Sequence, residues 1–185
     1  NVEHHALFKL AFATGMRRSE LLGLRWSDID FKKSTISISQ TALKIGSTAV
    51  ISNTTKTTSS KRIIAIDTET LQELMKHKTV IDKRRIKTMN WINNNLVFPG
   101  IKGAPRCPDE VSKLCKKYAS LIGKPTFTMH GTRHTHATLL IENGANMKAI
   151  QERLGHASFQ ETMDTYSHVT PKMEDDIVER ISKIF

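Results

Sequence analysis

One short block of alternating residues lies in a chain whose other periodic segments have helical spacing. Residues 35–39 read Thr-Ile-Ser-Ile-Ser, an alternation typical of a half-buried strand. Two more strands are predicted over 49–53 and 62–66, and the polar segment 54–61 between them predicts a hairpin tip. We therefore predict a mainly α fold (α+β) with a small three-stranded antiparallel β-sheet as its only β element.

The remaining segments predict helices separated by short connections. Apolar residues recur at three- and four-residue spacing, and Gly144 and Gly155 follow two of these segments as stop signals. Ser19 and Asp67 are predicted as N-caps, and Pro108 as the first residue of a helix. The predicted helices cover 5–13, 19–26, 68–83, 108–121, 132–143, 147–154, 161–166 and 171–185. A chain of 185 residues is long enough for one domain with its own core, so we predict a single domain over 1–185.

The charge of the chain favours a polyanionic partner. Lysine and arginine number 28 against 18 aspartate and glutamate residues, which gives a net charge of +10. A basic but merely solvated surface is the ordinary alternative, and charge alone favours nucleic acid only modestly. No apolar run is long enough to cross a bilayer and no signal-peptide pattern is present, so we expect a cytoplasmic protein with no membrane partner.

Histidine and cysteine do not form a recognisable metal motif. His130 and His134 are four residues apart, but the glutamate of a zinc-protease motif is missing between them, and no cysteine or carboxylate ligand is evident nearby. Cys107 and Cys115 are too few for a structural zinc site, and a disulfide between them is not expected in the cytoplasm. We predict two free thiols, no metal and no cofactor.

Several polar residues are candidates for binding a phosphate, although each has an ordinary structural explanation. Arg17 follows a glycine turn and could hold a phosphate with its guanidinium fork, but taken alone a salt bridge to Glu20 or Asp28 is favoured. Arg133 lies three residues after His130, so the two share a face if the segment is helical. The alternative there is a capped helix start whose histidines face solvent.

Three further residues gain interest from their context. His156 follows Gly155 at a helix stop, a common position for histidine in any protein. Tyr166 lies in a polar segment, where a tyrosine is more often exposed than buried. Lys56 lies on the predicted hairpin tip, where lysines are ordinarily just solvated.

Taken together, these residues resemble one known pattern. The segments Thr14-Gly15-Met16-Arg17-Arg18-Ser19-Glu20, His130-Gly131-Thr132-Arg133-His134 and Leu154-Gly155-His156, followed by Tyr166-Ser167-His168, occur in this order. The chain resembles the catalytic domain of the tyrosine recombinase (phage integrase) family over almost its whole length. The resemblance implies six active-site residues: Arg17, Lys56, His130, Arg133, His156 and the nucleophile Tyr166. One departure is Gly131-Thr132, where many members carry an acidic or small residue and then leucine.

The implied reaction is cleavage and rejoining of DNA through a 3′-phosphotyrosine link. Arg17 and Arg133 would stabilise the charge that grows on the phosphate oxygens, so no metal is required. His130 is the expected base for the phenol, and Lys56 the expected acid for the leaving 5′ oxygen. His156 would hydrogen-bond a phosphate oxygen or orient the site. The link conserves the bond energy, so religation needs no ATP.

The resemblance also implies partners beyond the chain itself. Double-stranded DNA carrying attachment or crossover sites is the expected substrate, in a tetrameric synapse formed by self-association on DNA, with accessory directionality or bending proteins. The expected biological role is integration or excision of a phage or other mobile element. We expect N-terminal DNA-binding domains outside these 185 residues. A final helix over 171–185, with Met173, Ile177 and Ile181 on one stripe, packs either on a neighbouring protomer or on its own core.

Three other functions are compatible with part of the sequence pattern. A DNA-binding regulator that does not cut would need the basic surface but not the six residues. A metal-dependent nuclease would lose activity in chelator and survive Tyr166→Phe. A type IB topoisomerase shares the chemistry but relaxes supercoils without recombinant products.

Overall fold

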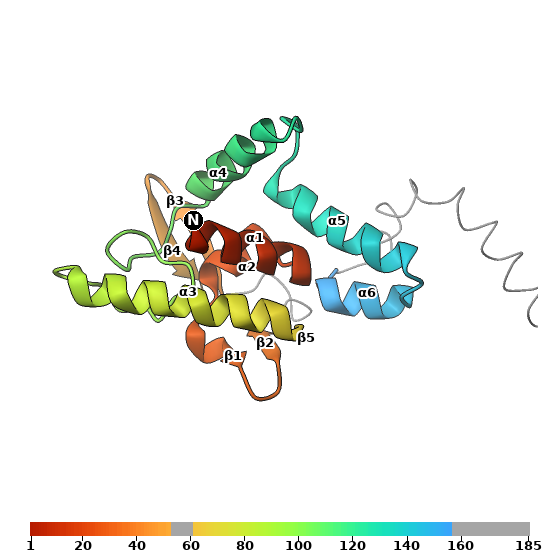
Figure 1. The fold of residues 1–185 in the computed structure, drawn as a ribbon, viewed down its shortest axis with the longest axis horizontal. Coiled ribbons are helices and arrows are strands. Elements are labelled where there is room, and N and C mark those ends of the chain that lie inside the picture. Colours follow the sequence, from red (N-terminus) through yellow and green to blue (C-terminus); the bar gives the residue numbers. More distant parts are fainter. Residues whose placement is uncertain (53–60, 157–185) are drawn as a thin grey trace, which may run out of the picture.

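The computed structural model describes residues 1–52 and 61–156. Among these residues the strands follow one another between the second and third helices, and the remaining helices come after them (Figure 1). The helices are α1 (Val2–Thr14), α2 (Arg18–Gly23), α3 (Thr68–Lys87), α4 (Pro108–Leu121), α5 (Met129–Glu142) and α6 (Met147–Leu154), with a 3-10 turn at Trp26–Asp28. The strands are β1 (Ile29–Asp30), β2 (Thr35–Ile38), β3 (Thr41–Ile45), β4 (Thr48–Ser52) and β5 (Arg62–Ala65).

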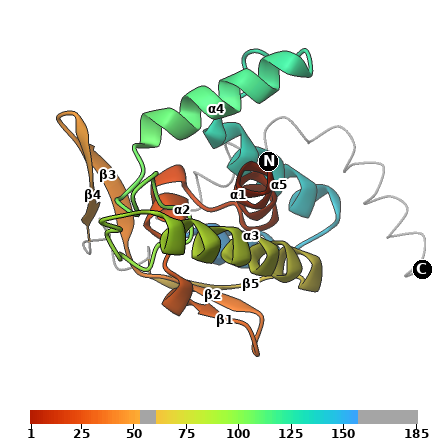
Figure 2. The ribbon, with the colours of Figure 1, turned by 60° about the vertical axis from the view of Figure 1, so that its left-hand side comes forward.

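Helix α1 is the centre of the helical layer and packs against both α3 and α5 (Figure 2). Its buried residues include Leu7, Leu10 and Ala11, which recur at helical spacing and enter the main core. The Asn1 side chain accepts hydrogen bonds from the backbone at the start of the helix, and Gly15 ends it in the left-handed conformation with φ 64°. The turn after α1 is therefore fixed by local chemistry.

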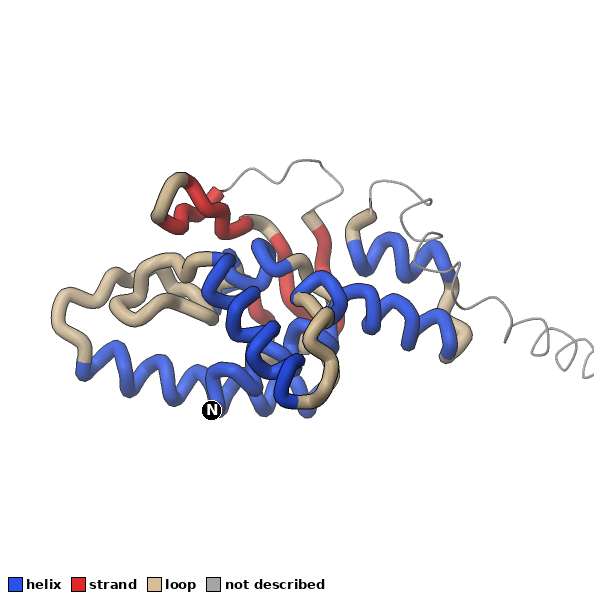
Figure 3. The backbone as a smooth tube through the Cα atoms, turned by 90° about the horizontal axis from the view of Figure 1, so that it is seen from above, coloured by secondary structure: helices blue, strands red, loops and turns tan. Residues whose placement is uncertain are grey.

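The β-structure forms two separate antiparallel sheets. One has the strand order β1-β2-β5, with Ile36 opposite Ile64 and both side chains buried. The other is the hairpin β3–β4, which stands apart from the other strands in Figure 3. The prediction of a small antiparallel sheet in a mainly helical fold is confirmed.

The prediction that all strands belong to a single three-stranded sheet is wrong. The segment predicted at 49–53 is β4, which pairs with the unpredicted β3 and not with β2 or β5. At the point where the chain passes from β2 in one sheet to β3 in the other, α2 packs closely against it. The Gln40 side chain donates to the Gly23 carbonyl at 2.6 Å, and a Cβ on Gly23 would lie 2.8 Å from the Thr41 Cα. Strand β1 was also missed, because two residues are too short to show a period.

Two helix starts differ from the sequence prediction and both affect the site. Helix α2 begins at Arg18 with Arg17 as its N-cap, so Ser19 is not the cap. The Glu20 carboxylate accepts a hydrogen bond from the Arg17 backbone N–H at 2.8 Å, which is the reason for the earlier start. Helix α5 begins at Met129 and not at Thr132, because the Thr128 hydroxyl caps it by accepting from the Gly131 N–H. His130 therefore lies in the first turn of α5.

The predicted end of the helix over 19–26 is wrong, because Leu24 has extended backbone angles and α2 ends at Gly23. The other predicted helices that the structure describes match its helices to within four residues at each end. Helix α6 has the predicted bounds. Cys107 and Cys115 are free thiols, which confirms that prediction. No described helix is long and apolar enough to cross a membrane. The prediction that 54–61 is a hairpin tip is wrong, because the flanking strands β4 and β5 pair with β3 and β2 and belong to different sheets. Residues 54–60 themselves and the helices predicted over 161–166 and 171–185 lie outside the described residues.

Candidate active site

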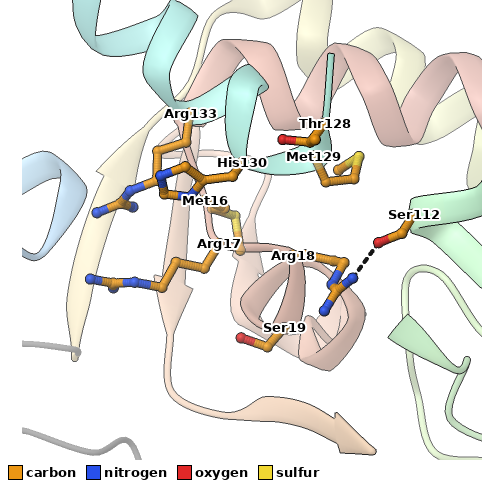
Figure 4. Close-up of a pocket in the computed structure, with 9 residues that line it drawn as sticks. All are labelled: Met16, Arg17, Arg18, Ser19, Ser112, Thr128, Met129, His130 and Arg133. Carbon is orange, nitrogen blue, oxygen red and sulfur yellow. Dashed lines mark hydrogen bonds between the residues drawn. The ribbon is translucent and has the colours of Figure 1, made fainter. Parts of the chain in front are cut away.

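A pocket of about 370 Å³ opens where the start of α2 meets α4 and α5. Three of the six predicted site residues line it: Arg17, His130 and Arg133. In Figure 4 the side chains of Arg17 and Arg133 project in the same direction, and the His130 ring lies beside Arg133. The complete lining is Met16, Arg17, Arg18, Ser19, Ser112, Thr128, Met129, His130 and Arg133.

Arg17 is held at this pocket by two acceptors from different parts of the chain. One guanidinium nitrogen, Nη1, donates to the Glu20 carboxylate at 3.1 Å, and the other, Nη2, donates to the Gly155 carbonyl at 3.1 Å. The ion pair with Glu20 that the sequence suggested is therefore present, whereas Asp28 pairs with Arg25 instead. The Arg17 side chain is still 38% exposed. The ion pair thus orients Arg17 without removing it from the pocket.

Glu20 is a buried carboxylate that joins Arg17 to a second arginine. Its side chain is 3% exposed, and both oxygens accept from Arg62, at 3.0 and 2.9 Å. Burial alone would raise the pKa of this carboxyl, but the hydrogen bonds and charge of Arg62 and then of Arg17 outweigh burial and leave the pKa below its ordinary value. Glu20 is therefore charged at neutral pH. In the sequence, Glu20 is recognisable only as an ordinary ion-pair partner of Arg17, from its spacing of three residues.

Arg133 reaches the site from α5, one turn after His130. Its side chain is 4% exposed, and its Nη1 donates to the Gly15 carbonyl at 2.9 Å. Gly15 is the residue that ends α1, so the turn after α1 and the helix α5 together fix this guanidinium. His130 is exposed at the pocket edge. The predicted shared face of His130 and Arg133 is confirmed.

His156 lies directly after the glycine that ends α6. Burial and the positive charges of Arg133, Arg17, Arg62 and His130 lower the pKa of its imidazole to about 4. These charges act on His156 because the four side chains lie near it. At neutral pH the imidazole is therefore uncharged, and it can donate one hydrogen bond and accept another.

The structure brings together four of the six predicted residues: Arg17, His130, Arg133 and His156. They come from the turn after α1, from α5 and from the end of α6. Lys56 and Tyr166 lie outside the described residues. Two guanidinium groups, a half-buried neutral imidazole and an exposed histidine are suited to binding a tetrahedral anion. Within 1–52 and 61–156, no group of three or more His, Cys, Asp and Glu side chains is arranged to hold a metal ion.

The chain matches one protein-family model over residues 1–173, described as the phage integrase family. A protein named tyrosine recombinase XerC-like, from Caldanaerobacter subterraneus, is 32% identical over 97% of this chain and 49% of its own length. The integrase of Staphylococcus phage L54a is 34% identical over 92% of this chain and 49% of its own length. The chain thus spans about half the length of these curated relatives.

Solved structures with the same fold include complexes with DNA. The Tn1549 transposon integrase in complex with transposon right end DNA has a TM-score of 0.76 and is 29% identical, over 97% of this chain and 59% of that one. The XerA recombinase has a TM-score of 0.71 at 23% identity, over 97% of this chain and 57% of that one. Both similarities confirm the predicted fold.

Proposed function

Because this chain belongs to the phage integrase family, we propose that it is the catalytic domain of a site-specific recombinase that cuts and rejoins DNA through a covalent 3′-phosphotyrosine. The observation that carries this proposal is the convergence of Arg17 and Arg133 beside the half-buried His156. Each arginine is oriented by a backbone carbonyl, Gly155 for Arg17 and Gly15 for Arg133. Guanidinium groups that are already held in place lose little conformational entropy when they bind a phosphate, and their N–H donors match its two non-bridging oxygens.

The proposed reaction is one transesterification at a DNA phosphate. The phenol oxygen of Tyr166 forms a bond to phosphorus while the bond from phosphorus to the 5′ oxygen breaks. His130 takes the phenol proton, and Lys56 gives a proton to the 5′ oxygen. Arg17 and Arg133 bind the non-bridging oxygens, whose charge grows in the pentacoordinate state. Rejoining is the same step reversed, with a new 5′ hydroxyl as the attacking group.

The uncharged state of His156 fits a distinct task in this scheme. A neutral imidazole N–H donates to a phosphate oxygen without adding a further charge beside two arginines. Its low pKa, caused by burial and by Arg133 and Arg17, keeps it in that state at neutral pH. We therefore assign His156 to holding the phosphate and not to proton transfer.

Double-stranded DNA is the proposed substrate. The net charge of +10 favours a polyanion, and the similar Tn1549 integrase was solved with transposon DNA. Integration or excision of a phage or other mobile element is the role we propose, because one similar protein is a phage integrase. A tetrameric synapse, accessory proteins, further N-terminal domains and a cytoplasmic location stay predictions.

The test is formation of a covalent adduct on a nicked duplex. The protein is incubated in chelator with a pool of nicked duplexes of random sequence, and detergent-resistant protein–DNA adducts are recovered and sequenced. The chain has two tyrosines, so Tyr118→Phe is a matched control for Tyr166→Phe. Tyr118 lies on α4, with its hydroxyl hydrogen-bonded to His4. We expect adduct from the wild type and from Tyr118→Phe, and none from Tyr166→Phe or Arg17→Ala.

Other outcomes separate the alternatives. An adduct that persists in Tyr166→Phe would contradict the assigned nucleophile. Cleavage only with added divalent metal would indicate a metal-dependent nuclease. DNA binding without any adduct would indicate a regulator. Relaxation of supercoiled DNA with no recombinant products would indicate a topoisomerase.

A further inference from the structure

The last turn of α6 is fastened to three other elements by a single side chain, Arg153. Its Nε donates to the His136 Nε2 atom on α5 at 3.1 Å. Its Nη1 donates to the Ala65 carbonyl on β5 at 3.1 Å, and its Nη2 to the Ala13 carbonyl on α1 at 3.0 Å. Figure 1 shows α6 next to α5 and near the end of α1. One guanidinium therefore hydrogen-bonds to α5, β5 and α1 at once.

His136 completes this fastening by acting as both donor and acceptor. Because a guanidinium can only donate, the His136 Nε2 atom must accept from Arg153, and the proton is on Nδ1, which donates to the Phe12 carbonyl at 2.8 Å. The side chain is 7% exposed. Burial, and then the charge of Arg153, lower the pKa of the imidazole to about 4, so this neutral tautomer persists at physiological pH. We call Arg153 and His136 the α6 clasp.

The backbone of the same turn supplies acceptors to the arginines of the site. The Gly155 carbonyl accepts from Arg17 Nη2 at 3.1 Å. The Arg153 carbonyl accepts from Arg62 Nε at 2.7 Å, and Arg62 in turn holds Glu20, the partner of Arg17. His156 follows immediately. The last turn of α6 therefore affects the orientation of Arg17 in two ways, directly through the Gly155 carbonyl and indirectly through Arg62 and Glu20. It also determines where His156 lies, because His156 is the next residue.

Helix α6 depends on such contacts because it has little else to hold it. It is eight residues long and buries only Ile150 and Leu154. A helix of that length is not stable alone in water, so tertiary contacts decide where it lies. The packing beside the clasp leaves no spare room: a Cβ on Gly15 would lie 2.7 Å from both His136 and Leu154. A small shift of α6 would therefore disturb the contacts of the site.

We propose that Arg153 and His136 are positioning residues for strand cleavage: they seat the last turn of α6 so that the Gly155 carbonyl orients Arg17 and the His156 imidazole faces the scissile phosphate. The proposal rests on the proposed function for its substrate. Its structural half, the seating of His156, is measured without DNA.

The first experiment follows the titration of His156 by NMR in wild type, Arg153→Leu and Arg84→Leu. Arg84 is a matched control because it is also a half-buried arginine that bonds backbone carbonyls, those of Pro99 and Gly100, away from α6. His156→Asn identifies the resonance, and His77, buried against the Val97 carbonyl, is the internal reference. In Arg153→Leu we expect the pKa of His156 to rise from about 4 toward its ordinary 6.5, because α6 no longer holds the ring among the arginines. In Arg84→Leu the pKa of His156 should remain at its wild-type value.

The second experiment measures the rate of adduct formation at saturating DNA. We expect Arg153→Leu to slow it by about 10- to 100-fold, with DNA affinity unchanged, since displacement of catalytic groups by about 1 Å costs rates of this order. His136→Phe should show a similar loss, and His136→Gln, whose amide oxygen can accept from Arg153, should recover part of it. In a His156→Asn background the further loss from Arg153→Leu should be smaller than in wild type, because the part of the effect that acts through His156 is already absent and only the part that acts through Arg17 remains.

The outcomes separate the two proposals. If Arg153→Leu matches Arg84→Leu in both His156 titration and cleavage rate, Arg153 is only structural and the inference is wrong. If Arg153→Leu does not fold, the volume-conserving His136→Phe gives the same two readouts and decides the question. If the wild type forms no adduct but the His156 titration shifts as expected, the proposed function fails while the seating of His156 by the clasp stands.

Discussion

The buried carboxylate of Glu20 holds two arginines at the site, and Glu20→Gln tests how much that arrangement contributes. The carboxylate accepts four hydrogen bonds, from the Arg17 backbone and Nη1 at 2.8 and 3.1 Å and from the two Arg62 Nη atoms at 3.0 and 2.9 Å. Glutamine has nearly the same volume but no charge and one acceptor oxygen. The substitution therefore leaves the packing intact and removes the charge.

The expected loss of stability in Glu20→Gln follows from the burial of both Glu20 and Arg62. The Arg62 and Glu20 side chains are 7% and 3% exposed, so water cannot replace the lost contact. Removing one partner of a buried ion pair costs about 3–5 kcal/mol, because the other charge is left uncompensated. Since glutamine keeps one acceptor, we expect the lower end, about 3 kcal/mol, at neutral pH.

The cost should also depend on pH in a defined direction. The pKa of Glu20 in the folded chain lies below its ordinary value of 4.5. The charged carboxylate therefore stabilises the native state above pH 4.5, and this contribution is lost as the pH falls through the folded-state pKa. Wild type and Glu20→Gln should then approach the same stability in acid.

Urea unfolding followed by circular dichroism measures both effects. Asp28→Asn is the matched control, because Asp28 also pairs with an arginine three residues away, but that arginine, Arg25, is 36% exposed. We expect a loss of about 1 kcal/mol there. A loss in Glu20→Gln below about 1 kcal/mol at neutral pH, or one that is equally large below about pH 3, would refute the reasoning.

Two further predictions concern the turn after α1 and the pocket wall. Gly15→Ala should lower stability by about 2–4 kcal/mol, because φ is +64° and the added Cβ would lie 2.7 Å from His136 and Leu154. Gly46→Ala is the control: its φ is +59° but no atom lies within 4 Å of the added Cβ, so the loss should be only about 1 kcal/mol. Thermal unfolding of the two variants measures both losses, and equal losses would contradict the prediction. Arg18 lines the pocket and donates to the Ser112 hydroxyl. Arg18→Ala should reduce the slope of log affinity for DNA against log salt by about 0.9, as expected for one lost phosphate contact. Lys87→Ala, outside the pocket, is the control, and equal slopes in the two variants would show that Arg18 does not contact phosphate.

Most local features of the fold could be predicted from the sequence. Helical spacing and a glycine stop are local properties, so the bounds of α6 were predicted as the structure has them. The shared face of His130 and Arg133 follows from a spacing of three residues once the segment is helical. The start of α2 was predicted wrongly, because Arg17 caps the helix through the side chain of Glu20, a contact that no apolar period reveals.

The chemical groups of the chain and their order can be read from the sequence, since Arg17, His130, Arg133 and His156 belong to short motifs. The groups that hold these side chains in place depend on how distant segments pack. Glu20 and Arg62 are 42 residues apart, and Arg62 and the Arg153 carbonyl are 91 apart. The separation of β3–β4 from the other sheet likewise accompanies the packing of α2 on the chain near Thr41. A periodic pattern reports which face of an element is buried, but not which distant polar group it meets there, because that depends on how the elements pack together.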